Sequence, residues 1–198
     1  KLANFYGACM DEAALEKSAL GGLKPLQKKI TAVNSARTLT TAITELHASK
    51  VWVGFDISAS QDFKDATRVI AYLDQNGLGL PDRDYYLEDN DRMKTIRSKY
   101  VGHVEKMMTL AGSSKTQARA IAKDVMALET ELARVSMSKV DRRDPYKIYH
   151  KTSLSELKKL APTFGWDAYL AARSLKSLDD INVTVPKFFE GFDKLVRT

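Results

Sequence analysis

The organising segment of this chain is Gly77-Leu-Gly-Leu-Pro-Asp-Arg-Asp-Tyr-Tyr-Leu87, which separates two kinds of sequence pattern. Alternating apolar residues, typical of strands, precede it, and a long helical period follows it. Gly77 and Gly79 permit φ values that other residues avoid, and Pro81 fixes its own φ and favours an extended residue before it. The segment is therefore predicted to form a rigid corner.

The second half of this segment combines charges with aromatic rings. Asp82, Arg83 and Asp84 can form a local charge cluster. Tyr85 and Tyr86 can fix that cluster to a core, because each ring joins a large apolar area to a polar tip. Residue chemistry alone favours a well-anchored loop here.

Three helices are predicted ahead of the corner. Apolar residues at helical spacing predict one amphipathic helix over Lys1 to about Ala19, with Cys9 on its apolar side as a small buried residue. Pro25 suits the first turn of a second, short helix that runs to Val33. A third helix follows and places His47 near its C-terminal end, where the residue faces the helix dipole.

A two-stranded antiparallel ribbon is predicted between these helices and the corner. Apolar residues alternate with small or polar ones from Val51 to Ile57 and again from Thr67 to Asp74. The polar stretch from Ser58 to Ala66 can return the chain. Because two strands alone are not stable in water, the ribbon must lie on helices.

Two long helices are predicted after the corner. The first runs from about Met93 to Ala111 and ends at Gly112, and the second follows Ser114, which has the spacing of a capping box with Gln117. Their short connection predicts an antiparallel hairpin. The methionine-rich face of the first helix favours core packing, and a promiscuous binding surface is the alternative.

The last part of the chain mixes short elements. Asp141 to Lys151 interrupts the helical pattern, because Pro145 cannot continue a helix. Short helices are predicted over Ser153 to Leu160 and Trp166 to Ala172, followed by a brief extended segment from Ile181 to Val185. These patterns together predict a mainly α fold, a helical bundle-like lobe with a small two-stranded antiparallel β ribbon.

Pro186 opens the final predicted helix, in which Phe188, Phe189 and Phe192 crowd one side. Exposure of these rings to water would be unfavourable. We therefore expect a continuation of the chain to cover this aromatic side.

Composition excludes several classes of protein. The hydrophobic content of 44% is enough for a sizeable core, and no apolar run approaches the length needed to cross a bilayer. The net charge of +6 comes from 31 basic and 25 acidic residues that are mostly interspersed, so no nucleic-acid partner is expected. Cys9 is the one cysteine and cannot form an internal disulfide. Nothing near Lys1 looks like a signal peptide, and we expect the numbering to start inside a longer protein.

The corner segment resembles the corresponding segment of the neprilysin family of zinc metallopeptidases, which includes endothelin-converting enzymes and bacterial oligopeptidases. Three further segments resemble the same family in the same order. They are Phe5-Tyr-Gly-Ala-Cys-Met-Asp11, Gln61-Asp-Phe-Lys-Asp65 and Arg143-Asp-Pro-Tyr-Lys-Ile-Tyr-His-Lys151. The resemblance covers nearly the whole chain and is specific, but what it matches is the non-catalytic part of the family.

The resemblance implies that residues 1–198 are a single fragment of the N-terminal non-catalytic lobe, the lid, with the catalytic zinc lobe absent. In the family this lobe faces the catalytic lobe across a large cavity and restricts access to short peptides. Zinc is implied for the full-length metalloendopeptidase only, with the catalytic lobe and peptide substrates as partners. An extracytoplasmic compartment, periplasmic or secreted, is favoured. Cys9 matches a cysteine that pairs in animal members with a partner outside this region, and its pairing here stays open.

No catalytic or metal-binding residue is predicted in this fragment, which is expected to be inactive alone. The family's chemistry needs two histidines four residues apart with a glutamate between them, and His47, His103 and His150 lack that spacing. A structural role is expected for each histidine.

A separate set of residues consists of candidates for contact with the other lobe or for a structural motif: Asp82, Arg83, Asp84, Tyr85, Arg142, Arg143 and Asp144. The last three are expected to form an electrostatic clasp to the rest of the protein. The alternative is a helical protein-interaction module with no enzymatic parent.

Overall fold

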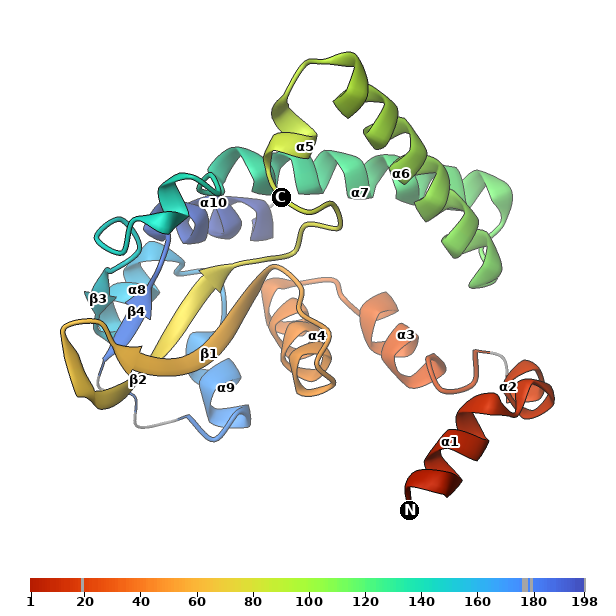
Figure 1. Ribbon diagram of the computed structural model, residues 1–198, viewed down its shortest axis with the longest axis horizontal. Coiled ribbons are helices and arrows are strands. Elements are labelled where there is room, and N and C mark those ends of the chain that lie inside the picture. Colours follow the sequence, from red (N-terminus) through yellow and green to blue (C-terminus); the bar gives the residue numbers. More distant parts are fainter. Residues whose placement is uncertain (19, 176–177, 179, 198) are drawn as a thin grey trace.

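The computed structural model describes residues 1–18, 20–175, 178 and 180–197. Figure 1 shows three parts: an N-terminal helical arm, a twisted sheet with short helices around it, and a long helical hairpin. Helix is the predominant secondary structure, so the prediction of a mainly α fold is confirmed.

The arm contains α1 (Leu2–Met10), α2 (Glu12–Ser18) and α3 (Lys24–Thr31), and no residue of these helices is buried. The single amphipathic helix predicted over Lys1 to about Ala19 is therefore wrong, and Cys9 is exposed rather than buried, whereas α3 confirms the short helix predicted from Pro25. Asp11 separates α1 from α2, because its carboxylate accepts a hydrogen bond from the Ala14 N–H at 3.0 Å and starts a new helix. The predicted helix end at Ala19 lies outside the described residues.

Helix α4 (Ala36–Ala48) joins the arm to the core. Ser35 and Thr38 form a capping box at its start. His47 is in the last turn, as predicted, but its side chain is fully buried and packs inside the protein. Packing in the interior, rather than the predicted interaction with the helix dipole, therefore determines the position of the His47 side chain.

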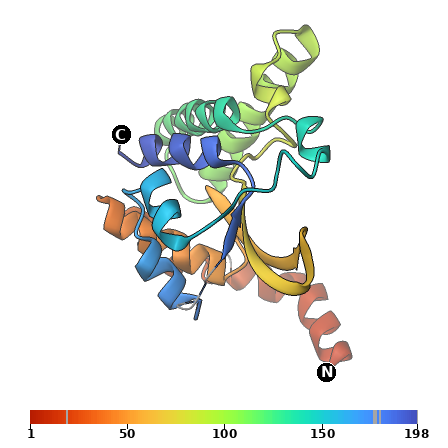
Figure 2. The ribbon, with the colours of Figure 1, turned by 90° about the vertical axis from the view of Figure 1, so that its left-hand side faces the viewer.

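Among the described residues, the sheet has four strands in the order β1-β2-β4-β3. They are β1 (Phe55–Asp62), β2 (Asp65–Gln75), β3 (Lys151–Thr152) and β4 (Ile181–Val183). The antiparallel β1–β2 pair is the predicted ribbon, but β2 also pairs in parallel with β4, and β3 pairs antiparallel with β4. In Figure 2 the β1–β2 ribbon curves outward, away from α8 and α9.

The boundaries of the ribbon differ from the prediction. The polar residues after Ile57 continue the strand to Asp62, so only residues 63 and 64 form the turn. Residues 51 to 54 are not part of the strand. Pairing with β2 overrides the polar composition, since a strand residue on an exposed face can be polar.

One core lies between the sheet and helices α8 (Leu154–Leu160), α9 (Trp166–Ala172) and α10 (Pro186–Val196). Phe55, on β1, has no exposed area, and its ring centroid lies 5.3 to 5.9 Å from those of five other aromatic residues. Phe188 and Phe189 of α10 are also fully buried, so the expectation that only a continuation of the chain would cover the aromatic side is wrong. Phe55 of β1 packs against Phe189 and Phe192, and Trp166 of α9 packs against Phe189.

The hairpin follows α5 (Asp84–Leu87) and consists of α6 (Asp91–Leu110) and α7 (Lys115–Val135). Its prediction is confirmed, including the Ser114–Gln117 capping box and Gly112, which has φ +98° just beyond α6. No residue of α6 is buried, and Met107 is half exposed. The prediction that the methionine-rich face packs in a core is therefore not fulfilled within the described residues. The short helix η1 (Asp141–Arg143) follows α7.

Candidate interface site at the glycine corner

The corner is rigid because its glycines are in contact with other backbone and side-chain atoms. Gly77 has φ +97°, and a Cβ there would lie 2.7 Å from the backbone nitrogen of Gly54, which itself has φ +73°. Gly79 does not have a positive φ. A Cβ at position 79 would instead overlap the Tyr100 hydroxyl, so this glycine is required for space.

A buried carboxylate fixes the corner to the helical hairpin. Glu129 of α7 accepts a hydrogen bond from the Tyr86 hydroxyl at 2.5 Å and another from the Tyr100 hydroxyl at 2.9 Å. The Leu80 N–H donates to the Tyr86 oxygen at 2.8 Å. Burial, and then the hydrogen bond to Glu129, raise the pKa of both tyrosines above the usual range, so both stay neutral donors.

In the predicted charge cluster of Asp82, Arg83 and Asp84, the first two residues make shorter contacts with residues 136 to 139 than with Asp84. Asp82 lies 2.6 Å from the Lys139 ammonium group, and the Arg83 guanidinium donates to the Ser136 carbonyl oxygen at 2.6 Å. The Arg83–Asp84 distance is 3.9 Å, which is long for an ion pair. Tyr85 is half-buried and its carbonyl oxygen accepts a hydrogen bond from Arg97.

Arg142 forms the strongest charge contact of the site. Its two terminal nitrogens donate to the two carboxylate oxygens of Asp74 at 2.6 and 2.5 Å, a bidentate geometry, and the Thr184 hydroxyl donates to the same carboxylate. Burial would raise the pKa of Asp74, but these hydrogen bonds outweigh it and hold the pKa below its usual value. Asp74 is thereby kept as the anion that Arg142 needs.

The other two members of the predicted clasp behave differently. Arg143 is exposed, and its side chain has no ion pair among the residues that the structure describes. Asp144 accepts a hydrogen bond from the Tyr146 N–H at 2.9 Å, which is a local turn contact. The structure therefore brings Arg142 to the corner, where it lines a pocket of about 250 Å³ with Asp82 and Arg83, and leaves Arg143 and Asp144 outside it.

A second charged cluster was not found from sequence. Asp62 is buried and accepts hydrogen bonds from the Lys64 N–H at 2.9 Å, the Tyr149 hydroxyl at 2.7 Å and the Lys151 ammonium group at 3.0 Å. The Lys64 and Tyr149 bonds are the main reasons why the pKa of Asp62 falls to about 2. Lys151 also lies 3.3 Å from Asp180. Asp62 lies in the segment Gln61–Asp65 and Tyr149 in the segment Arg143–Lys151, both of which resemble the neprilysin family. Their shared resemblance was the one indication in the sequence that these two segments are in contact.

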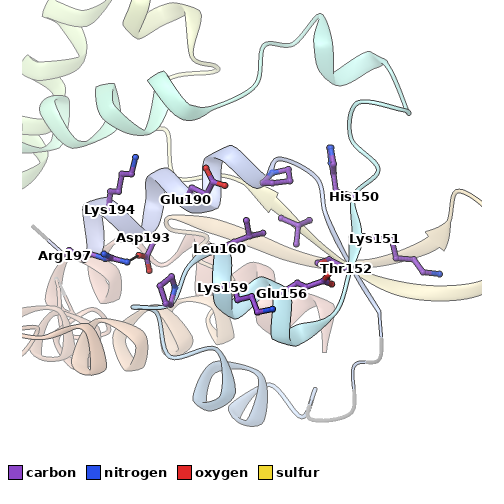
Figure 3. A pocket seen from close by; sticks show the side chains of 13 residues that line it. His150, Lys151, Thr152, Glu156, Lys159, Leu160, Glu190, Asp193, Lys194 and Arg197 are labelled. Atoms are coloured by element: carbon purple, nitrogen blue, oxygen red, sulfur yellow. Dashed lines mark hydrogen bonds and ion pairs between the residues drawn. The ribbon is translucent and has the colours of Figure 1, made fainter.

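A pocket of about 790 Å³ lies between α8, α10 and β3. Figure 3 shows the side chains that line it. Two of its acidic groups have structural partners: Asp193 is paired with Arg197 at 2.5 Å, and Glu156 caps the start of α8 through the Ser153 N–H. Leu160 and Val183 contribute apolar lining. The Thr152 hydroxyl donates to the Glu156 carboxylate at 2.8 Å. Hydrogen bonds from the Ser153 N–H and from the Thr152 hydroxyl lower the pKa of Glu156 to about 2, so this carboxylate is a poor general base, and we assign the pair to the capping of α8.

The histidines do not fit a zinc site. The ring nitrogens of His47 lie 2.8 Å from the Tyr169 hydroxyl and 3.0 Å from the Val53 carbonyl oxygen, whereas His103 and His150 are exposed on separate elements. Within the described part of the chain, no three His, Cys, Asp or Glu side chains are placed to hold a metal ion. None of the described helices is both long and apolar enough to span a membrane.

Comparison with known proteins identifies the family of this chain. A family model for peptidase family M13 matches residues 1–198. Endothelin-converting enzyme 1 of Cavia porcellus is 31% identical over 175 residues, which cover 84% of this chain and 23% of that protein. Neprilysin-3 of Drosophila melanogaster is 28% identical over 148 residues, which cover 72% of this chain and 19% of that protein.

Solved structures agree with the sequence comparison. The zinc metalloprotease Zmp1 of Mycobacterium tuberculosis, in complex with an inhibitor, superimposes with a TM-score of 0.87 and 28% identity. The match covers 94% of this chain and 29% of Zmp1, and the open state gives a TM-score of 0.88. The chain thus spans less than a third of the relatives that it matches. It belongs to peptidase family M13, whose members are zinc metalloendopeptidases, and corresponds to their N-terminal region.

Proposed function

We propose that this chain is the non-catalytic lobe of a zinc metalloendopeptidase, which encloses the active-site cavity and restricts substrates to short peptides. One observation carries the proposal: all of residues 1–198 match the family, yet they span less than a third of its members and their described side chains do not fit zinc. The metal and the hydrolytic chemistry are then supplied by residues outside this chain.

The rigidity of the corner supports the proposal that this chain forms one wall of the active-site cavity. A wall excludes folded proteins only if it keeps its shape, and the buried Tyr86–Glu129–Tyr100 contacts join the corner to both helices of the hairpin. The Arg142–Asp74 pair fixes the following segment to the sheet. These contacts hold the hairpin and the sheet in one arrangement.

Exposed apolar residues support contact with the rest of the protein. Leu2, Phe5, Tyr6 and Met10 of α1 are between 59% and 86% exposed, which is a large apolar area for one short helix. We assign this face to the interface with the catalytic region. The candidates for the same interface or for a structural motif remain Asp82, Arg83, Asp84, Tyr85, Arg142, Arg143 and Asp144, of which Asp82, Arg83 and Arg142 also make contacts within this chain.

The alternative of a helical interaction module with no enzymatic parent is disfavoured, because the family model extends over the whole chain. The experiment compares cleavage of a short peptide and of an unfolded protein by the intact enzyme and by its catalytic lobe alone. Without this chain, turnover of the short peptide is expected to fall, since the substrate loses a wall that orients it. Discrimination against the long substrate is expected to fall as well.

Addition of this chain in trans is expected to restore part of both properties. Zinc content, measured by metal analysis, should be the same in the lobe and in the intact enzyme. A catalytic lobe that stays folded and keeps the full preference for short peptides would contradict the lid role and leave this chain as a folding scaffold.

A further inference from the structure

The two outer edges of the sheet are protected to different extents. At one edge lies β3, which has two residues, one of them Lys151. A short, charged edge strand of this kind is a common protection against pairing with other chains. At the other edge lies β1, with eight residues and no lysine, arginine or proline among them.

The register shows which backbone groups of β1 are unpaired. The Thr184 N–H donates to the Leu73 carbonyl oxygen, so the backbone groups of Leu73 face β4 and those of Tyr72 and Asp74 face β1. Tyr72 is the partner of Ser58. Because neighbouring residues of a strand direct their groups to opposite sides, the N–H and C=O of Ile57 and Ala59 face the open edge.

This edge is accessible from Ser58 to Ser60, whereas the Gln61 carbonyl oxygen accepts a hydrogen bond from the Tyr72 hydroxyl at 2.8 Å. Ser58, Ala59, Ser60 and Gln61 are all exposed, and β1 pairs with β2 alone in the described sheet. Small side chains leave room for larger side chains on an added strand. Val69, the β2 partner of Gln61, is 70% exposed and offers an apolar surface on the face shared with Ala59.

We propose that the outer edge of β1, centred on Ala59, binds an extended peptide by adding it to the sheet as a further strand. Alternating N–H and C=O groups at a fixed spacing recognise an extended backbone and leave side-chain identity largely open. The proposal deepens the proposed function, on which it rests for the choice of ligand: it gives the wall of the cavity a contact that aligns a peptide of any sequence.

Two other occupants fit the edge less well. A permanent contact with another part of the same protein would have an apolar centre, whereas residues 58 to 61 are small or polar. A second copy of the chain would bring together two molecules with a net charge of +6 each, which opposes association.

The test measures amide hydrogen exchange of the 198-residue chain by NMR, with and without an acetylated and amidated peptide Glu-Thr-Val-Thr-Val-Thr-Glu. The Ile57 and Ala59 amides should exchange rapidly in the free chain and at least about tenfold more slowly at saturating peptide. The Ser58 and Ser60 amides, which face β2, should be protected in both states and report that the ribbon is intact.

Two matched pairs of controls make the result specific. Ala59→Pro removes the outward N–H and should abolish protection at Ile57, whereas Ala59→Ser should keep it. A peptide N-methylated on alternate residues has all its methyl groups on one side of the strand, so the N–H groups on its other side can still pair with β1 and it should bind. A peptide N-methylated on two adjacent central residues has neither edge intact and should not bind, a comparison that does not depend on the variants folding.

Several results would overturn the proposal. They are unchanged exchange at saturating peptide, equal protection in Ala59→Pro, or binding of the doubly blocked peptide. Protection without peptide that grows with chain concentration would assign the edge to a second copy. Because no catalytic lobe is present in this experiment, a negative result leaves the lid proposal standing.

Discussion

Gly79 and Tyr100 are in such close contact that a Cβ at position 79 would overlap the tyrosine hydroxyl and lie 2.7 Å from its Cζ atom. The same hydroxyl donates to the buried carboxylate of Glu129, so Tyr100 cannot move aside without breaking that hydrogen bond. The corner therefore depends on glycine at this position through packing rather than through φ.

Gly79→Val should lower the free energy of unfolding by at least about 1 kcal/mol, as overpacking of a well-filled site does. Gly79→Ala, which adds a smaller side chain, should lower it less. Denaturant unfolding of the chain measures this. The cost should be smaller in a Tyr100→Phe background, because the overlapping oxygen is then absent. An unchanged midpoint for Gly79→Val would show that the corner is conventional.

The bidentate contact between Arg142 and Asp74 predicts a clear difference between two adjacent arginines. Arg142→Ala leaves a half-buried carboxylate without its main partner and should cost about 2 kcal/mol of the free energy of unfolding. Arg143→Ala, at an exposed position, should change it by less than about 0.5 kcal/mol. Equal effects of the two substitutions in denaturant melts would show that Asp74 does not depend on Arg142.

His47 predicts a pH dependence of stability. Burial lowers its pKa, the hydrogen bond to the Val53 carbonyl oxygen partly offsets this, and Arg173 lowers the pKa further. The unfolded chain then takes up a proton more readily than the folded one, so the stability is complete above about pH 6.5 and declines as the pH falls below it.

His47→Gln should therefore flatten the difference between denaturant midpoints measured at pH 7.5 and 5.5. The exposed His103 provides the matched control, since His103→Gln should leave the difference as it is. A His47→Gln variant that loses as much stability over this interval as the parent chain would show that another group titrates.

Asp62 predicts a second effect at lower pH. Its pKa of about 2 lies below the ordinary value of 3.8, so its contribution is fully present above about pH 4 and is lost as the pH falls toward 2. Asp62→Asn should reduce the slope of stability against pH in this range. The slope should not vanish, because Glu156, which also has a pKa of about 2, titrates in the same interval. An unchanged slope would remove Asp62 from the acid response.

Local signals predicted much of the fold. Capping residues and glycines placed the α6–α7 hairpin correctly, because Ser114, Gln117 and Gly112 act within one or two helical turns. The short helices predicted over Ser153 to Leu160 and Trp166 to Ala172 are also present, as Leu154–Leu160 and Trp166–Ala172. Strand β1 was placed less well, since its polar half is a strand only through its pairing with β2.

The site was less predictable, because its contacts join residues that are far apart in sequence. The Arg142–Asp74 pair spans 68 residues and the Tyr149–Asp62 hydrogen bond spans 87. Charge type identified the Arg142–Arg143 dipeptide, but nothing local indicated which of the two faces Asp74. The burial of Phe189 was missed in the same way, because its ring partners Phe55 and Trp166 lie on other elements, β1 and α9.

The position of β4 between β2 and β3 has a consequence for folding during synthesis. Thr184 reaches Asp74 across 110 residues of chain, so β2 is made long before its parallel neighbour exists. The α6–α7 hairpin, whose contacts are local, can form as it leaves the ribosome, whereas sheet closure has to wait for nearly the entire chain and is the slower step. A nascent chain that stalls before Ile181 would therefore hold finished helices beside a strand that is unpaired on its inner side.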